Sequence, residues 1–325
     1  MTLNTENPTA SKSKIDSPAP LTVAVMITTH NRMEILRETC KVLEELYPPI
    51  DQVLICADGC TDGTVEMMQT QFPHYQLWVN QPGKGSVASR DRLMRKATTD
   101  LVLALDDDSY PLQSDIVERV QSLFATRPRL AVVSFPQRTE EYPDSLTADS
   151  FGNSFFCGSF ASAAACFRRS IYQQVDGFFT QFFHMYEEPD YALQCLAAGY
   201  EVWHETSIEI RHLWTGVSRN EIRNHHRHAR NEQWSLWRRC PFPYVLLLSP
   251  YRLVRQWQYA ASRGWRWIVR EPLWWWAMMQ SLPEVLGDRD PIPWSTYRAW
   301  IGLLSQPIYS EQEWQATFSK SSKAD

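Results

Sequence analysis

The stretch LVLALDDD, residues 101–108, ends an apolar run on three consecutive aspartates, Asp106, Asp107 and Asp108. A short apolar run bounded by polar residues is typical of a buried β-strand. Like charges side by side cost free energy unless a cation or a shifted pKa compensates them. The stretch therefore predicts a strand that ends at a site for something positively charged.

Short β-branched runs alternate with helical stretches throughout the region upstream of these aspartates. Strands of about four to eight residues separated by helices of about ten or more indicate β-α-β units and a mostly parallel sheet. Ligands bind beyond the carboxyl ends of the strands in such sheets. The clusters THNR (29–32), ADGCTDG (57–63) and DDD (106–108) each follow a predicted strand, so we expect them to share one edge of the sheet. The predicted strands are residues 21–29, 52–58, 75–80, 101–108 and 131–135, and the predicted helices are 31–46, 62–72 and 85–97.

Composition is that of a globular protein without spanning segments. The chain has 325 residues, 44% of them hydrophobic, enough for one large core or two modest ones. Residues 1–20 are polar and are expected to form a flexible tail without a secretory signal. Apolar runs such as LWWWAMM (273–279) fall far short of the ~20 residues that cross a bilayer. The seven cysteines lack a paired C-x-x-C spacing, so reduced thiols and a cytoplasmic location are expected.

Charge and tryptophan are concentrated toward the C-terminus. Net charge is −5, yet residues 205–270 carry twelve basic and four acidic residues. Eleven of the fourteen tryptophans follow residue 233. The overall negative charge and the lack of a recognised binding motif argue against nucleic acid as a partner. Residues 216–325 are therefore expected to form a helical, Trp/Arg-rich extension.

One segment of this extension predicts an amphipathic helix over residues 251–270. Such a helix can lie on an anionic membrane surface, with Trp at the headgroups and Arg near the phosphates. The alternative is a helix packed on the rest of the protein with its arginines in water. The expected basic face contains Arg252, Arg255, Arg263, Arg266 and Arg270, and the expected apolar face contains Leu253, Val254, Trp257, Ala261, Trp265 and Ile268.

Two further motifs follow the third cluster. MYEEPDYAL (185–193) contains the neighbouring carboxylates Glu187 and Glu188, and IRHLWTGVS (210–218) contains His212. With the three clusters, and in this order, they resemble the family 2 glycosyltransferases over about residues 21–240. That resemblance implies the GT-A fold, a Rossmann-like and mostly parallel sheet with helices on both faces. It would occupy residues 21–215, after the tail of residues 1–20 and before the helical extension of residues 216–325.

The resemblance also implies roles for individual residues. Asp108 and His212 would bind Mg²⁺ or Mn²⁺, with Asp106 as a further ligand. Glu188 falls where the family has its catalytic base, and Glu187 is the alternative. The residues that the resemblance assigns to the nucleotide-sugar are Thr29, Asn31, Arg32, Asp58, Gly85, Arg90, Asp106 and Asp107.

Together these roles predict an inverting, metal-dependent hexosyltransferase. The donor would be a nucleoside-diphosphate sugar, with UDP favoured, and the acceptor a growing polysaccharide or other glycan, or a lipid-linked sugar. A hard cation held by carboxylates stabilises the leaving diphosphate, and a carboxylate opposite it deprotonates the attacking hydroxyl. A lipid-linked acceptor suits a peripheral position on the inner face of the membrane. The alternatives are a nucleotidyltransferase and a non-catalytic nucleotide-sugar-binding module.

Each motif also has a purely structural interpretation. The aspartates 106–108 could cap a helix beginning within PLQSDIVERV (111–120), and ADGCTDGT (57–64) could be a capped turn. Glu187 and Glu188 could have no role beyond favouring the start of a helix. A lone histidine such as His212 is more often structural than a metal ligand. The spacing of His225, His226 and His228 favours a basic helix surface over a zinc site.

Overall fold

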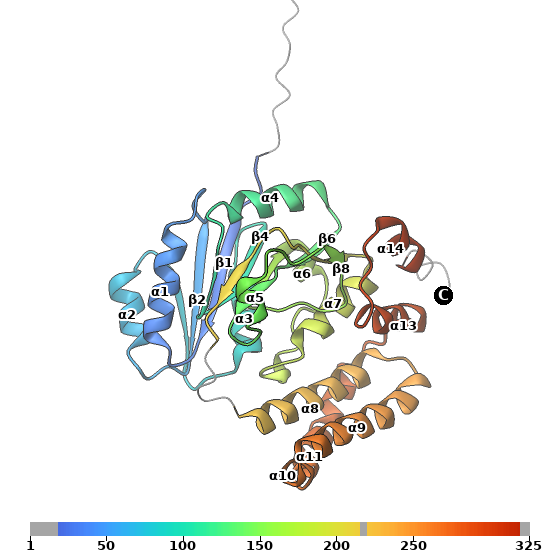
Figure 1. The fold of residues 1–325 in the computed structure, drawn as a ribbon. Helices are drawn as coiled ribbons and strands as arrows, with labels where there is room; N and C mark the ends of the chain where they lie inside the picture. The colour runs from blue at the N-terminus through green and yellow to red at the C-terminus, as the bar shows by residue number, and fades with distance from the viewer. Residues whose placement is uncertain (1–18, 215–219, 319–325) are drawn as a thin grey trace, which may run out of the picture.

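The computed structural model describes residues 19–214 and 220–318, and an eight-stranded sheet with the order β3-β2-β1-β4-β9-β6-β10-β8 lies at its centre (Figure 1). β1, β2, β3 and β4 are parallel to one another, as predicted. β9 runs antiparallel between β4 and β6, so the sheet is mixed at this point. The strands are β1 (Val23–Thr29), β2 (Gln52–Asp58), β3 (Gln76–Asn80), β4 (Leu101–Asp106), β6 (Leu130–Ser134), β8 (Phe155–Phe156), β9 (Ala164–Arg168) and β10 (Glu201–His204).

Both faces of this sheet are covered, which explains why its strands are continuous apolar runs. Side chains alternate between the two faces: Ala24 and Met26 of β1 belong to one core, and Val23 and Val25 to the other. The helices of this part are α1 (Met33–Glu44), α2 (Thr64–Gln71), α3 (Ser86–Lys96), α4 (Ile116–Thr126), α5 (Asp144–Thr147), α6 (Arg169–Gln174) and α7 (Glu187–Ala197). The expected α/β class, with helices on both faces, is therefore confirmed.

A second sheet of three short strands lies beside the end of β4. It has the order β5-β11-β7, formed by β5 (Ser109–Pro111), β11 (Ile210–His212) and β7 (Gln137–Thr139). In its register His212 lies opposite Ser109, the residue that follows the aspartates. This pairing brings a histidine that is about a hundred residues distant in sequence to the end of β4.

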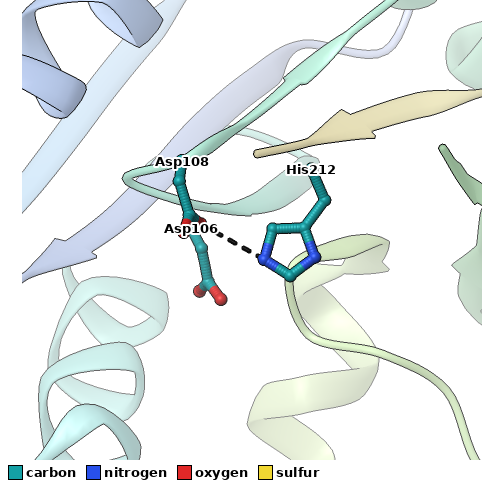
Figure 2. A group of neighbouring side chains, drawn as sticks. All are labelled: Asp106, Asp108 and His212. Atoms are coloured by element: carbon teal, nitrogen blue, oxygen red, sulfur yellow. Dashed lines mark ion pairs between the residues drawn. The ribbon is translucent and has the colours of Figure 1, made fainter. Parts of the chain in front are cut away.

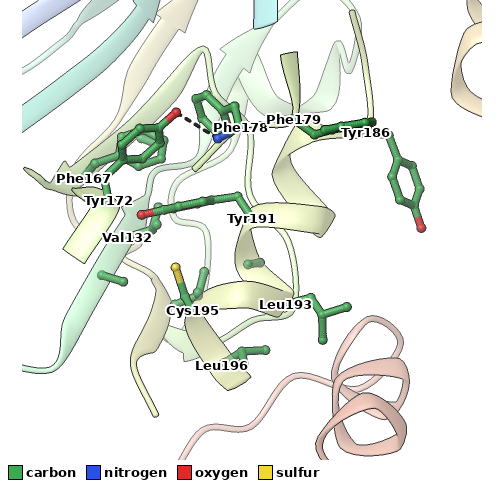
Figure 3. Close-up of a cluster of buried hydrophobic side chains, with 14 of the residues drawn as sticks. Val132, Phe167, Tyr172, Phe178, Phe179, Tyr186, Tyr191, Leu193, Cys195 and Leu196 are labelled. Carbon is green, nitrogen blue, oxygen red and sulfur yellow. Dashed lines mark hydrogen bonds between the residues drawn. The ribbon is translucent and has the colours of Figure 1, made fainter. Parts of the chain in front are cut away.

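An aromatic cluster fixes the position of α7 (Figure 3). The Tyr191 ring lies 5.2 Å from Tyr172 and 5.4 Å from Phe178, measured between centroids. The Phe178 N–H donates to the Tyr172 hydroxyl at 2.9 Å. Because all three side chains are buried, α7 and its first residues are held rigidly against the sheet.

The C-terminal region is helical, as expected. α8 (Glu221–Arg239), α9 (Tyr244–Arg263), α10 (Trp265–Ile268) and α11 (Glu271–Gln280) pack together below the sheet in Figure 1. α12 (Leu282–Gly287), α13 (Trp294–Leu303) and α14 (Glu311–Phe318) complete the described chain. No helix within residues 19–214 and 220–318 combines the length and hydropathy needed to cross a membrane. The expected tail lies almost wholly outside the described residues, and so does the expected boundary between residues 215 and 216.

The predicted single helix over residues 251–270 is wrong. α9 ends at Arg263 and Gly264 adopts a φ of 110°, which only glycine tolerates readily, before α10 begins. The arginines expected in water are confirmed in part: Arg255, Arg263, Arg266 and Arg270 are exposed, whereas Arg252 is buried. Arg252 and Arg255 both form ion pairs with Glu232 of α8, and Arg263 pairs with Glu221. Part of the expected apolar face is exposed as well, with Val254 53% and Trp257 46% exposed.

Candidate active site

The three aspartates lie at the carboxyl end of β4 and do not cap a helix. β4 ends at Asp106, and α4 begins ten residues later at Ile116, with Asp115 at its N-cap. Asp107 and Asp108 are buried, while Asp106 is half-buried. The interpretation of residues 106–108 as a cap of α4 is therefore excluded.

Asp107 connects the first and fourth strands. Its carboxylate accepts a hydrogen bond from the Thr29 hydroxyl at 2.7 Å and another from Arg32 Nη1 at 2.7 Å. Burial raises the pKa of Asp107 to about 6, and the neighbouring charge of Asp108 adds to this effect while Arg32 opposes it. Thr29 and Arg32, which the sequence assigned to the nucleotide-sugar, thus contact the acidic motif directly.

Asp106, Asp108 and His212 form a group that could hold a metal ion (Figure 2). One ligand atom from each lies within 4.8 Å of the others. Asp108 Oδ1 faces His212 Nε2 at 3.3 Å, and this buried oxygen makes no hydrogen bond within the described chain. Burial alone would raise the pKa of Asp108, but His212 and Arg32 outweigh burial and lower it, which keeps the carboxylate ionised. Two carboxylates and an imidazole around one point fit a divalent cation such as Mn²⁺ or Mg²⁺.

Arg90 of α3 links this group to the carboxylates on α7. Its Nη2 lies 2.5 Å from Asp106 Oδ1, and its Nη1 lies 2.7 Å from Glu187 Oε1. Burial alone would lower the pKa of Arg90, but the charges of Asp106 and Glu187 raise it. The guanidinium therefore stays charged and fixes the spacing between the two acidic groups.

Glu187 and Glu188 begin α7 but have different surroundings. Glu187 is 2% exposed, and burial together with the charge of Glu188 raises its pKa to about 8, against the opposing effect of Arg90. Glu188 is half-buried, and the Ser162 N–H donates to its Oε1 over a long 3.4 Å. Both border a cavity of about 980 Å³, but only Glu188 is free of an ion pair with Arg90 within the described residues.

Asp58 is the last residue of β2. Its carboxylate accepts backbone N–H groups of Lys84 and Gly85, both at 2.8 Å, and the Asn80 amide at 2.9 Å. Burial would raise the pKa of Asp58, but these donors outweigh it and lower the pKa. Gly85 has a φ of 92°, and a Cβ there would meet the Phe183 carbonyl at 2.3 Å, so only glycine fits. The turn of ADGCTDGT is held instead by Asp62, which accepts from the Thr64 and Met33 N–H groups.

Asn31, in the loop after β1, contacts the loop after β2. Its side-chain oxygen accepts the Thr61 N–H at 2.7 Å, and its own φ is 54°. The bond fixes the loop after β2 to the loop after β1. Glu188 and His212 border the cavity, whereas Asn31, Asp58 and Gly85 are not among its lining residues.

Asn231 of α8 holds the loop that leads into α7. Its amide nitrogen donates to the carbonyls of Phe182, His184 and Met185 at 3.1, 3.0 and 2.7 Å. Met185 and Tyr186 both have a φ of 74°, a strained conformation for non-glycine residues that needs such support. The pair Arg230-Asn231 is part of the resemblance to the family, but the sequence does not reveal this role of Asn231, because the three acceptors are backbone atoms.

The prediction that His225, His226 and His228 form a basic helix surface is wrong for His225. His225 is buried, and its Nε2 lies 2.8 Å from Glu271 Oε1 on α11. His225 therefore helps to join α8 to α11.

Asp190 is a second residue whose importance the sequence did not reveal. It is 1% exposed, accepts the Ser235 hydroxyl at 2.6 Å, and lies 3.5 Å from Arg238 Nη1. Asp190 therefore joins α7 to α8 through a buried charge pair.

Replacing Asp190 with Ala is expected to lower the free energy of unfolding by about 3–5 kcal/mol, because Arg238 loses its buried partner. Urea denaturation measures this change. Asp176→Ala is the matched control: Asp176 also pairs with arginines of α8, but its side chain is 56% exposed, so its loss should cost much less. Equal losses for the two variants would contradict the assignment.

A cavity of about 980 Å³ joins these groups. Arg90, Asp106, Glu187, Glu188 and His212 all line it. Its walls also include Ser159 to Ala163 before β9 and several residues of α8. The volume is at the upper end of the range for a small-molecule site.

Comparison with known proteins gives this arrangement a context. The family model "Glycosyl transferase family 2" matches residues 24–185, which contain β1 to β4, the acidic motif and the loop before α7. The chain belongs to glycosyl transferase family 2. No curated protein matches the chain at a significant level.

Solved structures with the same fold are glycosyltransferases of the GT-A type. The crystal structure of GalNAc-T7 with UDP, GalNAc and Mn²⁺ has a TM-score of 0.55 at 11% identity, covering 70% of this chain and 49% of that one. The mannosyltransferase PcManGT from Pyrobaculum calidifontis, with GDP-Man and Mn²⁺, has a TM-score of 0.54 at 18% identity and covers 89% and 85%. S. aureus TarS residues 1–349 with UDP has a TM-score of 0.51 at 13% identity and covers 66% and 65%. This family 2 chain thus spans about half the length of the first of these structures.

Proposed function

We propose that the chain is an inverting, metal-dependent glycosyltransferase that moves a sugar from a nucleoside-diphosphate sugar to a hydroxyl group. The observation that carries the proposal is the sharing of one cavity by Asp106, His212 and Glu188. UDP is the favoured nucleotide, since two of the three neighbours described above were crystallised with it. The acceptor is a glycan or a lipid-linked sugar.

Donor binding would use two regions of the sheet edge. Asp58, already oriented by three donors, has room to accept a further hydrogen bond from a nucleobase N–H. Asp106, Asp108 and His212 would hold Mn²⁺ or Mg²⁺, which stabilises the negative charge of the departing diphosphate. Arg32 would keep Asp107 and Asp108 in place through its two ion pairs.

Glu188 would act as the general base. Its carboxylate takes the proton of the acceptor hydroxyl as that oxygen forms a bond to the anomeric carbon. The bond from this carbon to the diphosphate breaks on the opposite side, so the anomeric configuration inverts. Arg90, by binding both Asp106 and Glu187, would fix the base relative to the leaving group.

Donor binding is tested by thermal stability with UDP, GDP, dTDP or CDP, each with Mn²⁺, Mg²⁺ or EDTA. A ligand that binds only the native state raises Tm by mass action. At a ligand concentration of 100 Kd the free energy of unfolding increases by about 2.7 kcal/mol. We expect one nucleotide, UDP first, to raise Tm with metal and to lose this effect in EDTA. No shift with any nucleotide at saturating concentration would refute the proposal. Release of pyrophosphate from a nucleoside triphosphate would point to a nucleotidyltransferase instead.

We also propose that the protein associates peripherally with an anionic membrane surface. The support is the apolar surface of the C-terminal helices, where Leu247, Trp265, Leu273 and Trp276 are 70%, 69%, 64% and 67% exposed. Sedimentation with anionic vesicles should deplete the protein from solution, whereas the variant with Trp265→Ser and Trp276→Ser should stay in the supernatant. Equal depletion of both proteins would contradict the role of this surface.

A further inference from the structure

A pocket of about 320 Å³ between α8 and α11 gathers positive charge. Arg223, Arg227 and Arg230 of α8 line one side, and Arg270 borders the other. None of the described residues that line the pocket is acidic. None of the four guanidinium groups forms an ion pair with a carboxylate of the described chain, in contrast to Arg255, which pairs with Glu232.

The contacts of these arginines are with uncharged groups: Arg230 donates to the Asn231 side chain and the Phe182 carbonyl, and Arg227 lies over the Phe183 ring. Within the described chain, the like charges therefore remain without a negative charge to offset them. Burial and the charge of Arg227 lower the pKa of Arg230 to about 10. Burial and the charge of Arg223 likewise lower the pKa of Arg227. Glu271, which directly follows Arg270, is buried and already accepts from His225 and from the Trp274 indole N–H at 2.8 Å. An anion seated between the arginines would relieve the repulsion and receive charge-assisted hydrogen bonds.

The outer wall of the pocket is apolar. Leu273, Trp274 and Ala277 of α11 line it, and Leu273 is 64% exposed. Trp276, three residues after Leu273 and therefore beside it on the helix, is 67% exposed. The arrangement suits a ligand that has an anionic head and a hydrocarbon chain.

The pocket adjoins the cavity of the candidate active site. Asn220, Arg223 and Arg227 line both spaces. A molecule with its anionic group in the smaller pocket can therefore extend a hydroxyl group toward Glu188, which borders the larger one. Simple adhesion to a membrane would not require the pocket to adjoin the active cavity.

We propose that the pocket binds the phosphate of a lipid-linked acceptor, with the hydrocarbon chain on the exposed apolar side of α11. The proposal rests on the proposed glycosyltransferase function and names its acceptor class as an alkyl phosphate that carries the accepting hydroxyl group or sugar. The arginines bind the phosphate, Leu273 and Trp276 contact the chain, and the acceptor end enters the active cavity.

Isothermal titration with octyl phosphate below its micelle concentration tests the proposal without donor or turnover. The double variant Arg223→Gln/Arg270→Gln removes two arginines whose side chains make no hydrogen bond or ion pair with the described chain, so its fold should be preserved. We expect it to bind octyl phosphate at least tenfold more weakly than the unchanged protein. Arg266→Gln, on exposed α10 outside the pocket, is the matched control and should bind normally.

Three further arms identify the ligand chemistry. Octyl glucoside, which has the chain without the phosphate, and inorganic phosphate, which lacks the chain, should each bind at least tenfold more weakly than octyl phosphate. Excess UDP with Mn²⁺ should not displace octyl phosphate. Equal binding to the double variant, equal binding of inorganic phosphate, or displacement by UDP would overturn the proposal. Because the nucleotide panel measures donor binding separately, failure here leaves the proposed function standing.

Discussion

Replacing Glu188 with Gln is expected to lower kcat by about 10²- to 10⁴-fold while leaving donor binding unchanged. Glutamine keeps the shape of the side chain but cannot accept the proton of the attacking hydroxyl. Glu188 makes no ion pair with Arg90 in the structure, so the substitution leaves the links from Arg90 to Asp106 and Glu187 intact. Initial rates of nucleoside-diphosphate release, with the donor identified by thermal shift, measure the effect.

Glu187→Gln is the matched control because it removes the neighbouring carboxylate of the same helix. Its loss should weaken the contact with Arg90 Nη1 and thereby disturb the site more broadly, changing KM for the donor as well as kcat. If Glu188→Gln retains near-normal turnover and Glu187→Gln loses it with donor binding intact, Glu187 is the base. The raised pKa of Glu187, about 8, would then require activity to increase with pH through that range.

The sequence was sufficient to predict the first half of the fold. β1 to β4 and α1 to α3 begin and end within a few residues of the predicted limits, because each strand is a continuous apolar run and each helix is bounded by polar turns. The antiparallel strand β9 was not predicted, since the small residues of AACFR (164–168) specify close packing without a direction. The short strands β5, β7 and β11 depend on pairing between distant residues, which no local pattern encodes.

The site shows the same division. Asp106, Asp108 and His212, which the resemblance assigned to one metal site, lie close together in the structure. The position of the two aspartates follows from the carboxyl end of β4, whereas that of His212 does not. The contacts of Arg32 with Asp107 and Asp108 were not predictable, because they depend on how the loop after β1 turns. The prediction for α9 failed for a related reason. A helical projection places the arginines on one face, but it includes neither the break at Gly264 nor the acids of α8 that pair with Arg252, Arg255 and Arg263.

Replacing Asp108 with Ala is expected to abolish the metal-dependent increase in Tm that the donor nucleotide produces. Asp108 Oδ1 is the buried oxygen that faces His212 without a hydrogen bond of its own in the described chain. Loss of a residue that merely orients a metal ligand typically weakens metal binding about 10- to 100-fold. Loss of a ligand itself should therefore weaken binding by more than about 100-fold and reduce turnover to a similar extent.

Asp115→Ala provides the matched control, because Asp115 follows the same motif but lies at the N-cap of α4 and pairs with Arg119 at the surface. It should keep the full nucleotide-induced and metal-dependent increase in Tm. The direct measurement is titration of Mn²⁺ followed by electron paramagnetic resonance, which counts free ion without any nucleotide. If Asp108→Ala binds Mn²⁺ as the unchanged protein does, the pairing of Asp108 Oδ1 with His212 has a purely structural role. The ion pairs of Asp108 with Arg32 and His212 would then serve only to hold the end of β4 in place.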